Sequence, residues 1–267
     1  GYTLPSDGQN IRMIYNLTSN HYLKTMRMAM YVSDSYRLKS SLGYFAINAG
    51  LRFSYWDFNK EFLVSPRANV AFVPERNNAW TFRFATGLYY QQPFYKEFRK
   101  QVTDSYGNTN VDLNSDIKSQ QSLHFILGSD YTFRMFDRPF KLSAEAYYKK
   151  LNKLIPYEID NLKVVYQGEN LTDGYTAGLD LKLFGQFVPG TDSWISFSVM
   201  KTGENLNGIT VPRPTDQRYS LAVFFTDYFP KFPKLKFSLR GILSDGLPTT
   251  APHSSRDKGY FRAPAYK

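Results

Sequence analysis

The feature that most constrains this chain is a two-residue alternation of apolar and polar side chains, which recurs in segment after segment. In residues 44–56, every second side chain from Phe45 to Tyr55 is apolar or aromatic, whereas the positions between them include Asn48 and Arg52. Successive side chains of a β-strand point to opposite faces, so this spacing predicts a strand with two unlike faces. The pattern predicts strands over residues 24–38, 44–56, 67–73, 80–90, 123–133, 141–149, 175–183, 195–199, 219–226 and 235–240.

In the regular segments, the apolar face carries no Lys, Arg, Asp or Glu. A lipid-facing surface requires this, because a Lys or Arg near the middle of a bilayer costs roughly 2–4 kcal/mol. We therefore predict which side chains project outward from a curved sheet: Phe45, Ile47, Leu51, Phe53, Phe82, Phe84, Leu88, Phe125, Leu127, Leu179, Leu181, Val223 and Phe237. The charges predicted on the concave side are Arg52, Arg83, Asp130, Glu145, Asp180 and Arg240.

The connections between the strands alternate between short and long. Short, turn-rich connections are predicted at 39–43, 74–79, 135–140, 188–193 and 229–234, and long ones at 57–66, 91–120, 151–174, 203–216 and 244–264. One rim of a transmembrane barrel carries short turns and the other carries long loops, whereas a soluble β-sandwich adhesin has no reason to keep this order. The sequence therefore predicts an all-β fold, an antiparallel transmembrane β-barrel segment of about ten strands.

Two terminal features are also expected. Residues 263–267 would begin another strand, and a small hairpin is expected around residues 11–17. The start of the chain carries no signal peptide, so we expect it to be a piece of a longer precursor. No linker interrupts the series of strands, which predicts one domain over residues 1–267.

Composition agrees with a barrel and excludes other classes. Aromatic residues make up 17% of the chain although the hydrophobic fraction is only 42%, as expected if aromatic girdles border a lipid-facing band. No apolar run is long enough for a transmembrane helix. The absence of cysteine excludes disulfides and thiolate metal sites. The net charge of +10 comes from scattered single residues, so we expect no nucleic-acid partner.

Several segments, in order along the chain, resemble those of one family. They include YVSDSYRLKSSLGYFAINAGLR at 31–52, VSPRANVAFVP at 64–74, FATGLYYQQPFYKEF at 84–98, AEAYYKKLNKLIPYEIDN at 144–161, GYTAGLDL at 174–181, VPRPTDQRYSL at 211–221 and FRAPAYK at 261–267. Together they resemble the TonB-dependent outer-membrane receptors of the Bacteroidetes type. The resemblance implies a barrel of about 22 strands with an N-terminal plug domain in its lumen. Because the plug and the final strand are absent from the sequence, the chain is expected to be the C-terminal part of such a barrel.

The resemblance also implies a function and a set of partners. We expect a segment of an integral receptor of the bacterial outer membrane, which takes up a scarce nutrient with energy from TonB. The implied partners are membrane lipid or lipopolysaccharide, the plug of the same protein, the TonB complex through that plug, and a small nutrient ligand of unknown identity; no cofactor is implied. A passive porin or small standalone barrel remains the main alternative, and plug-like sequence upstream would distinguish the two.

Candidate ligand-binding residues lie where predicted strands meet the long loops. They are Tyr90, Gln92 and Tyr95, in an aromatic run, and Tyr157, in the loop 151–174. Such a run is typical of an interfacial girdle, and it could also stack against a ligand.

Other candidates have structural explanations. Arg213, Asp216 and Arg218 resemble an element of the family and are expected to fix a loop-to-strand transition by ion pairs. Oxygen-bearing residues on the loop 151–174, such as Glu169 and Asp173, suit turns better than a Ca²⁺ site. The histidines lack the spacing of metal ligands. The sequence shows no arrangement of a nucleophile or of paired acids that would predict an enzyme.

Overall fold

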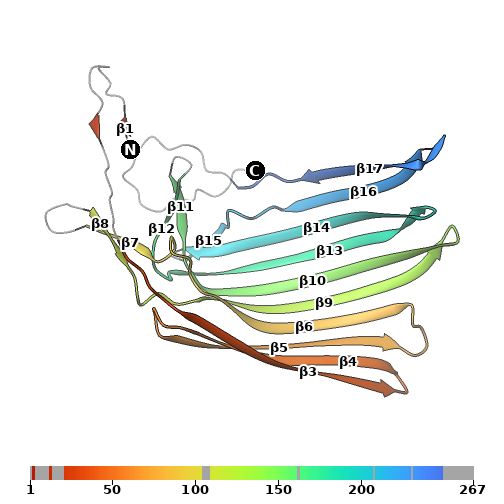
Figure 1. The fold of residues 1–267 in the computed structure, drawn as a ribbon, viewed down its shortest axis with the longest axis horizontal. Helices are drawn as coiled ribbons and strands as arrows, with labels where there is room; N and C mark the ends of the chain where they lie inside the picture. The colour runs from red at the N-terminus through yellow and green to blue at the C-terminus, as the bar shows by residue number, and fades with distance from the viewer. Residues whose placement is uncertain are drawn as a thin grey trace.

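The computed structural model describes residues 2–3, 12–13, 21–103, 109–160, 163–206, 208–229 and 231–248. Its main feature is one antiparallel sheet, in which ten strands follow one another as a meander (Figure 1). In chain order they are β3 (Arg27–Ser40), β4 (Gly43–Trp56), β5 (Glu61–Pro74), β6 (Trp80–Gln91), β9 (Gln120–Met135), β10 (Arg138–Leu154), β13 (Thr172–Val188), β14 (Thr191–Leu206), β16 (Tyr219–Phe229) and β17 (Phe232–Ser244).

Shorter strands lie within the connections. The strand β15 (Ile209–Pro212) pairs with the last residues of β14 and lies off the main path of the meander. Three separate two-stranded pairs are β1 (Tyr2–Thr3) with β2 (Arg12–Met13), β7 (Arg99–Thr103) with β8 (Thr109–Leu113), and β11 (Tyr157–Asp160) with β12 (Lys163–Tyr166). No helix among the described residues is long and apolar enough to cross a membrane.

The strand registers confirm the predicted faces. Directly paired residues share a face, and a polar row runs from Arg83 through Gly128, Glu145, Asp180 and Ser198. A neighbouring row on the other face is apolar and runs through Phe84, Leu127, Ala146, Leu179 and Val199. All the charges predicted for the concave side share the polar face, and all the predicted outward residues share the apolar face.

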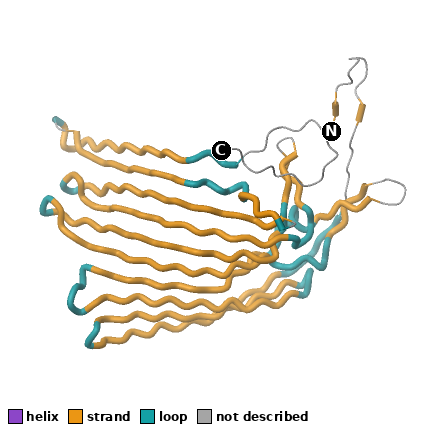
Figure 2. The backbone as a smooth tube through the Cα atoms, turned by 180° about the vertical axis from the view of Figure 1, so that it is seen from behind, coloured by secondary structure: helices purple, strands orange, loops and turns teal. Residues whose placement is uncertain are grey.

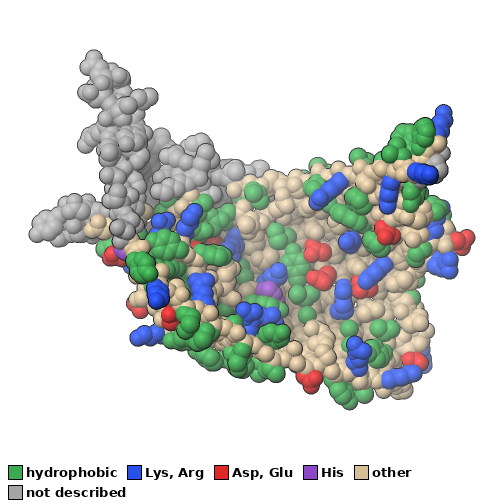
Figure 3. All heavy atoms as spheres, in the orientation of Figure 1, with side chains coloured by type: hydrophobic (Ala, Val, Ile, Leu, Met, Phe, Trp, Pro, Cys, Tyr) green, Lys and Arg blue, Asp and Glu red, His purple; other side chains and the backbone are tan. Residues whose placement is uncertain are grey.

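We call the polar side the hollow face, because the sheet curves around it, and the apolar side the outward face. Figure 3 looks onto the hollow face, where Lys, Arg, Asp, Glu and His side chains lie across the middle of the sheet. On the outward face, Leu127 is 62% exposed although it lies in a central strand. The strand β3 departs from the pattern, because Asp34 is paired with Ala49 and therefore faces outward.

The sheet is open, as expected for part of a larger barrel. Among the described strands, β3 and β17 form its two edges and do not pair with each other. A small standalone barrel would have required residues 24–38 to pair with residues 235–243. The structure does not contain that closure.

The two rims of the sheet differ, as predicted. Figure 2 shows tight turns at one end and the additional hairpins at the other. The tight turns between consecutive strands are two to five residues long. The long connections 91–120, 151–174 and 203–216 carry β7–β8, β11–β12 and β15.

One connection was predicted wrongly. The connection 57–66 is not a long loop, because β5 already begins at Glu61 and leaves only residues 57–60 as a turn. The prediction placed Pro66 outside a strand, whereas the structure places it inside β5, although proline has no N–H to donate to a ladder. However, β5 pairs with β6 only between Arg67 and Phe72, so Pro66 lies where one edge of β5 is unpaired.

Two further expectations concern the ends of the chain. The strand expected at 263–267 lies outside the described residues. Most of the hairpin expected around 11–17 also lies outside them, and its described part, Arg12–Met13, pairs with Tyr2–Thr3.

Candidate functional site

The hairpin-bearing end has its own apolar core. Trp56, the last residue of β4, is fully buried on the hollow face and packs with Phe98, Ile117 and Ile155. The ring of Trp56 meets that of Phe98 edge-on at 5.7 Å, and its indole N–H donates to the Thr25 hydroxyl at 2.7 Å. Since Trp56 points to the hollow side, the long connections fold inward over the hollow at this end.

Polar contacts fix the segment before β3, and the connection that contains Ile117, to the turn between β4 and β5. The carboxylate of Asp57 accepts hydrogen bonds from the Thr25 hydroxyl and, at 2.8 Å, from the Met26 amide. These bonds, the Thr25 bond first, lower the pKa of Asp57. The amide of Asn59 donates to the Ile117 carbonyl at 2.7 Å. The loops at this end are therefore held in defined positions.

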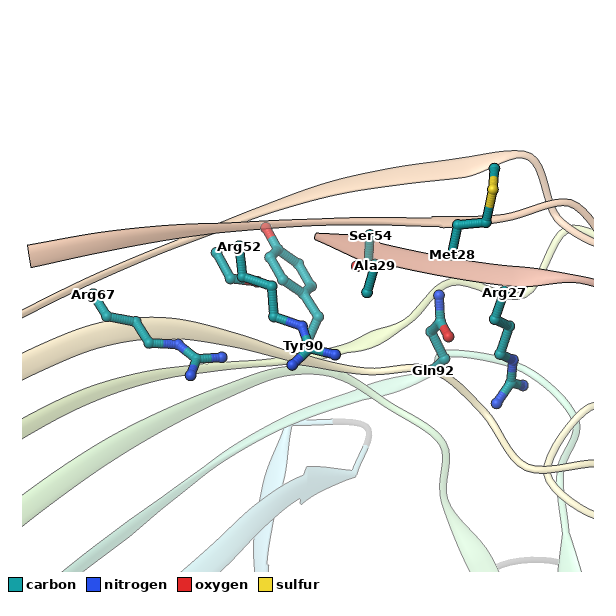
Figure 4. A pocket seen from close by; sticks show the side chains of 9 residues that line it. Arg27, Met28, Ala29, Arg52, Ser54, Arg67, Tyr90 and Gln92 are labelled. Atoms are coloured by element: carbon teal, nitrogen blue, oxygen red, sulfur yellow. The ribbon is translucent and has the colours of Figure 1, made fainter. Parts of the chain in front are cut away.

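Below these loops, the hollow face contains a pocket of about 500 Å³. Three arginines from three consecutive strands line it, namely Arg27 of β3, Arg52 of β4 and Arg67 of β5. Its other lining residues are Met28, Ala29, Ser54, Ser65, Tyr90 and Gln92. Figure 4 shows the three guanidinium groups pointing off the same side of the sheet, while Met28 points the other way. We call this the arginine pocket.

Aromatic rings position two of the arginines. The guanidinium of Arg27 lies over the Trp56 ring, 4.3 Å from its centroid, and donates to the Pro93 carbonyl at 2.7 Å. The guanidinium of Arg67 lies 4.6 Å from the centroid of the Tyr89 ring, which stacks on His124 at 4.3 Å. Cation–π contacts of this kind orient a guanidinium without neutralising it.

Glycines make room for Arg67. Its register partners are Gly50 in β4 and Gly87 in β6, so no side chain stands beside it on the hollow face. A Cβ atom added at Gly87 would lie 3.2 Å from Arg67 and 3.0 Å from Tyr89. The two glycines therefore leave room for the guanidinium over the aromatic ring.

The structure brings two of the predicted ligand-binding residues into this pocket. Tyr90 is the residue before the end of β6, where that strand has separated from β5. Its pairing with Gln121 places its side chain on the outward side of β6, opposite to the three guanidinium groups, and its hydroxyl accepts a hydrogen bond from the Gln121 amide at 3.2 Å. Gln92 follows in the chain, and its side-chain nitrogen is buried with no hydrogen-bond partner. Such a group is an available donor for a ligand oxygen.

The other two predicted residues do not line the pocket. Tyr95 is 40% exposed, and its ring packs edge-on against Phe98 at 5.6 Å. Tyr157 lies in β11, where its ring faces Tyr166 at 5.5 Å across the hairpin. Both remain on the hairpin-bearing rim, on two different connections.

The residues expected to fix a loop-to-strand transition lie beside β14. Asp216 is 2% exposed, pairs with Arg218 at 2.7 Å and accepts a hydrogen bond from the Thr202 amide at 2.7 Å. Arg213 lies instead 3.8 Å from Glu204. The Arg213–Glu204 pair and the Thr202–Asp216 hydrogen bond tie the segment before β16 to β14, while the Arg218–Asp216 pair lies within that segment.

Other charged residues of the sequence have local partners. At mid-sheet, Asp130 pairs with Arg83 and Lys141, each at 3.2 Å. In the loop 151–174, Glu169 pairs with Lys100, and Asp173 accepts a hydrogen bond from the Lys153 amide at 3.0 Å. Among the described residues, no group of three His, Asp or Glu side chains gathers as a metal site would require.

Sequence reasoning missed the arginines as a set. The alternation placed Arg52 on the concave side, but nothing local to Arg27 or Arg67 indicated that both meet it. The one available signal was the two-residue alternation. It places Arg52 and Arg67 on the same, polar face of two adjoining strands.

Comparison with known proteins gives one finding. A family model described as "TonB dependent receptor-like, beta-barrel" matches residues 2–266, nearly the whole chain. No curated protein matches it.

Proposed function

This chain belongs to the TonB-dependent receptor-like β-barrel family, and we propose that it forms part of the wall and the outer rim of a receptor that imports a scarce nutrient. The family consists of outer-membrane receptors and transporters rather than enzymes. The apolar outward face would then lie against lipid and lipopolysaccharide, and the hairpin-bearing end would face the outside of the cell.

The observation that carries the proposal is the difference between the two rims. Tight turns at one rim leave little surface for recognition. At the other rim, β8 and β12 contribute side chains to a packed core, β15 pairs with β14, and a pocket lies on the hollow face. Binding residues are commonly presented by loops that a rigid scaffold positions.

The rest of the machinery follows from the family. We propose that this chain is the C-terminal part of a larger barrel, whose plug domain occupies the hollow and contacts TonB. Charges along the hollow face, such as Glu145 and Asp180, would face that plug. The Bacteroidetes type rests on the motifs of the sequence alone.

The proposed ligand contacts come from the long connections and the outer lumen. Tyr90, Gln92, Tyr95 and Tyr157 all lie at that end, and aromatic faces supply large contact area at low entropic cost. The candidate nutrients are iron chelates, cobalamin, peptides and glycans.

Growth of a deletion strain tests this function. The strain should grow poorly when one of these nutrients is limiting, and the intact gene should restore growth only in cells with functional TonB. Restored growth that is equal with and without TonB would contradict the proposal and favour a passive porin.

A further inference from the structure

We propose that the arginine pocket, formed by Arg27, Arg52 and Arg67, binds an oxyanion group of the imported nutrient, a carboxylate or a phosphate. This inference rests on the proposed import function and specifies the chemistry of its ligand. The pocket lies on the hollow face, next to Gln92 at the start of the connection that carries β7–β8. Its volume of about 500 Å³ suits a small molecule.

Charge is the first argument. Among the described residues, none of the three arginines forms an ion pair with a carboxylate, and no Asp or Glu lines the pocket. Elsewhere on the same face, Arg83 is paired with Asp130. Three cations that share one pocket repel one another, and a bound anion would relieve that repulsion.

Preorganisation is the second argument. Arg27 and Arg67 are oriented by the rings of Trp56 and Tyr89 rather than by acids, so their charges remain available. Arg52 is directly paired with Ser65, and Arg67 lies two residues further along β5, which makes the two arginines diagonal neighbours on one face. A planar guanidinium fork matches a carboxylate or phosphate in two parallel hydrogen bonds.

The uncharged residues that line the pocket add further hydrogen-bond donors to those of the arginines. The buried side-chain nitrogen of Gln92 has no hydrogen-bond partner, and Ser54 and Ser65 add hydroxyl groups. Guanidinium and amide N–H groups only donate, and hydroxyls can donate as well. Three cations and a set of donors together favour an anionic ligand rich in acceptors over an uncharged or cationic one.

The test is a calorimetric titration of the intact receptor in detergent, with citrate, inorganic phosphate and uncharged maltose as probes. We expect citrate and phosphate to bind, with affinity that falls as salt is raised, and maltose not to bind. Arg52→Gln and Arg67→Gln should each weaken citrate binding about tenfold. Arg37→Gln is the matched control, because Arg37 lies on the same face of β3 but does not line the pocket, and it should leave the affinity unchanged.

Two results would overturn the inference. One is citrate binding that is unaffected by both pocket variants. The other is no binding of any anion together with a lower melting temperature of both variants, which would indicate that carboxylates of the plug already pair with the arginines. The titration contains no TonB, so a failure of energised uptake would count against the import function and leave this result standing.

Discussion

Phe197 and Ser198 are neighbours in β14 that face opposite sides of the sheet. Phe197 is paired with Leu181 and Leu221 on the outward face and is 40% exposed there. Ser198 is paired with Asp180 on the hollow face. The same substitution at these two positions therefore places an arginine at one depth in two different environments.

The expected effects follow from depth. Phe197 is seven residues beyond Gly190 in the turn, which at about 3.3 Å per residue and a tilt of about 40° puts it roughly 18 Å above that turn. This lies within an apolar band about 25 Å tall. Between the midplane and the interface, Phe197→Arg should destabilise the receptor by about 1–3 kcal/mol more than Phe197→Ala, since both changes remove the ring. Ser198→Arg should be nearly neutral or gain up to about 1 kcal/mol from Asp180.

Urea unfolding of the intact receptor in phospholipid vesicles measures these differences. The free energy of unfolding should fall in the order Ser198→Arg, Phe197→Ala, Phe197→Arg. If Ser198→Arg proved more destabilising than Phe197→Arg, the assignment of the two faces would be wrong. Equal values for Phe197→Ala and Phe197→Arg would show that this face does not contact lipid.

Three more predictions use the same receptor. Gly185→Ala should cost about 1–3 kcal/mol, because its Cβ would lie 2.3 Å from the Phe140 ring, whereas Gly241→Ala meets nothing within 4 Å and should be neutral in the same unfolding assay. Asp216→Ala should lower the free energy of unfolding by roughly 2–3 kcal/mol, since it removes the acceptor of the Thr202 amide and the partner of Arg218. The exposed Asp192→Ala is the control and should leave the melting temperature unchanged. An unchanged melting temperature for Asp216→Ala would contradict the prediction. Alanine at Tyr90, Tyr95 or Tyr157 should weaken nutrient binding about five- to tenfold. Arg76→Ala and Asp137→Asn, at the tight turns, should leave binding unchanged. Binding that survives all three tyrosine changes would refute the placement of the ligand at the hairpin-bearing rim.

The faces of the strands could be predicted from the sequence because they depend on local period. Once a segment is extended, the alternation from Phe45 to Tyr55 leaves no choice about which side chains share a face. The tight turns of the opposite rim were equally predictable, since their length and composition are local properties. The strand that includes Pro66 was not, because its tolerance of proline depends on where a neighbouring strand stops pairing.

The arginine pocket was decided by tertiary structure alone. Arg27, Arg52 and Arg67 stand on three strands, and the registers between those strands determine that they share one pocket. Likewise, the packing of Trp56 against Phe98 and Ile117 folds long connections over the hollow face. The sequence by itself determined that the chain forms a two-faced antiparallel sheet with unlike rims. Which charges meet near the hairpin-bearing rim depended on contacts between residues far apart in the chain, and no local pattern encodes such contacts.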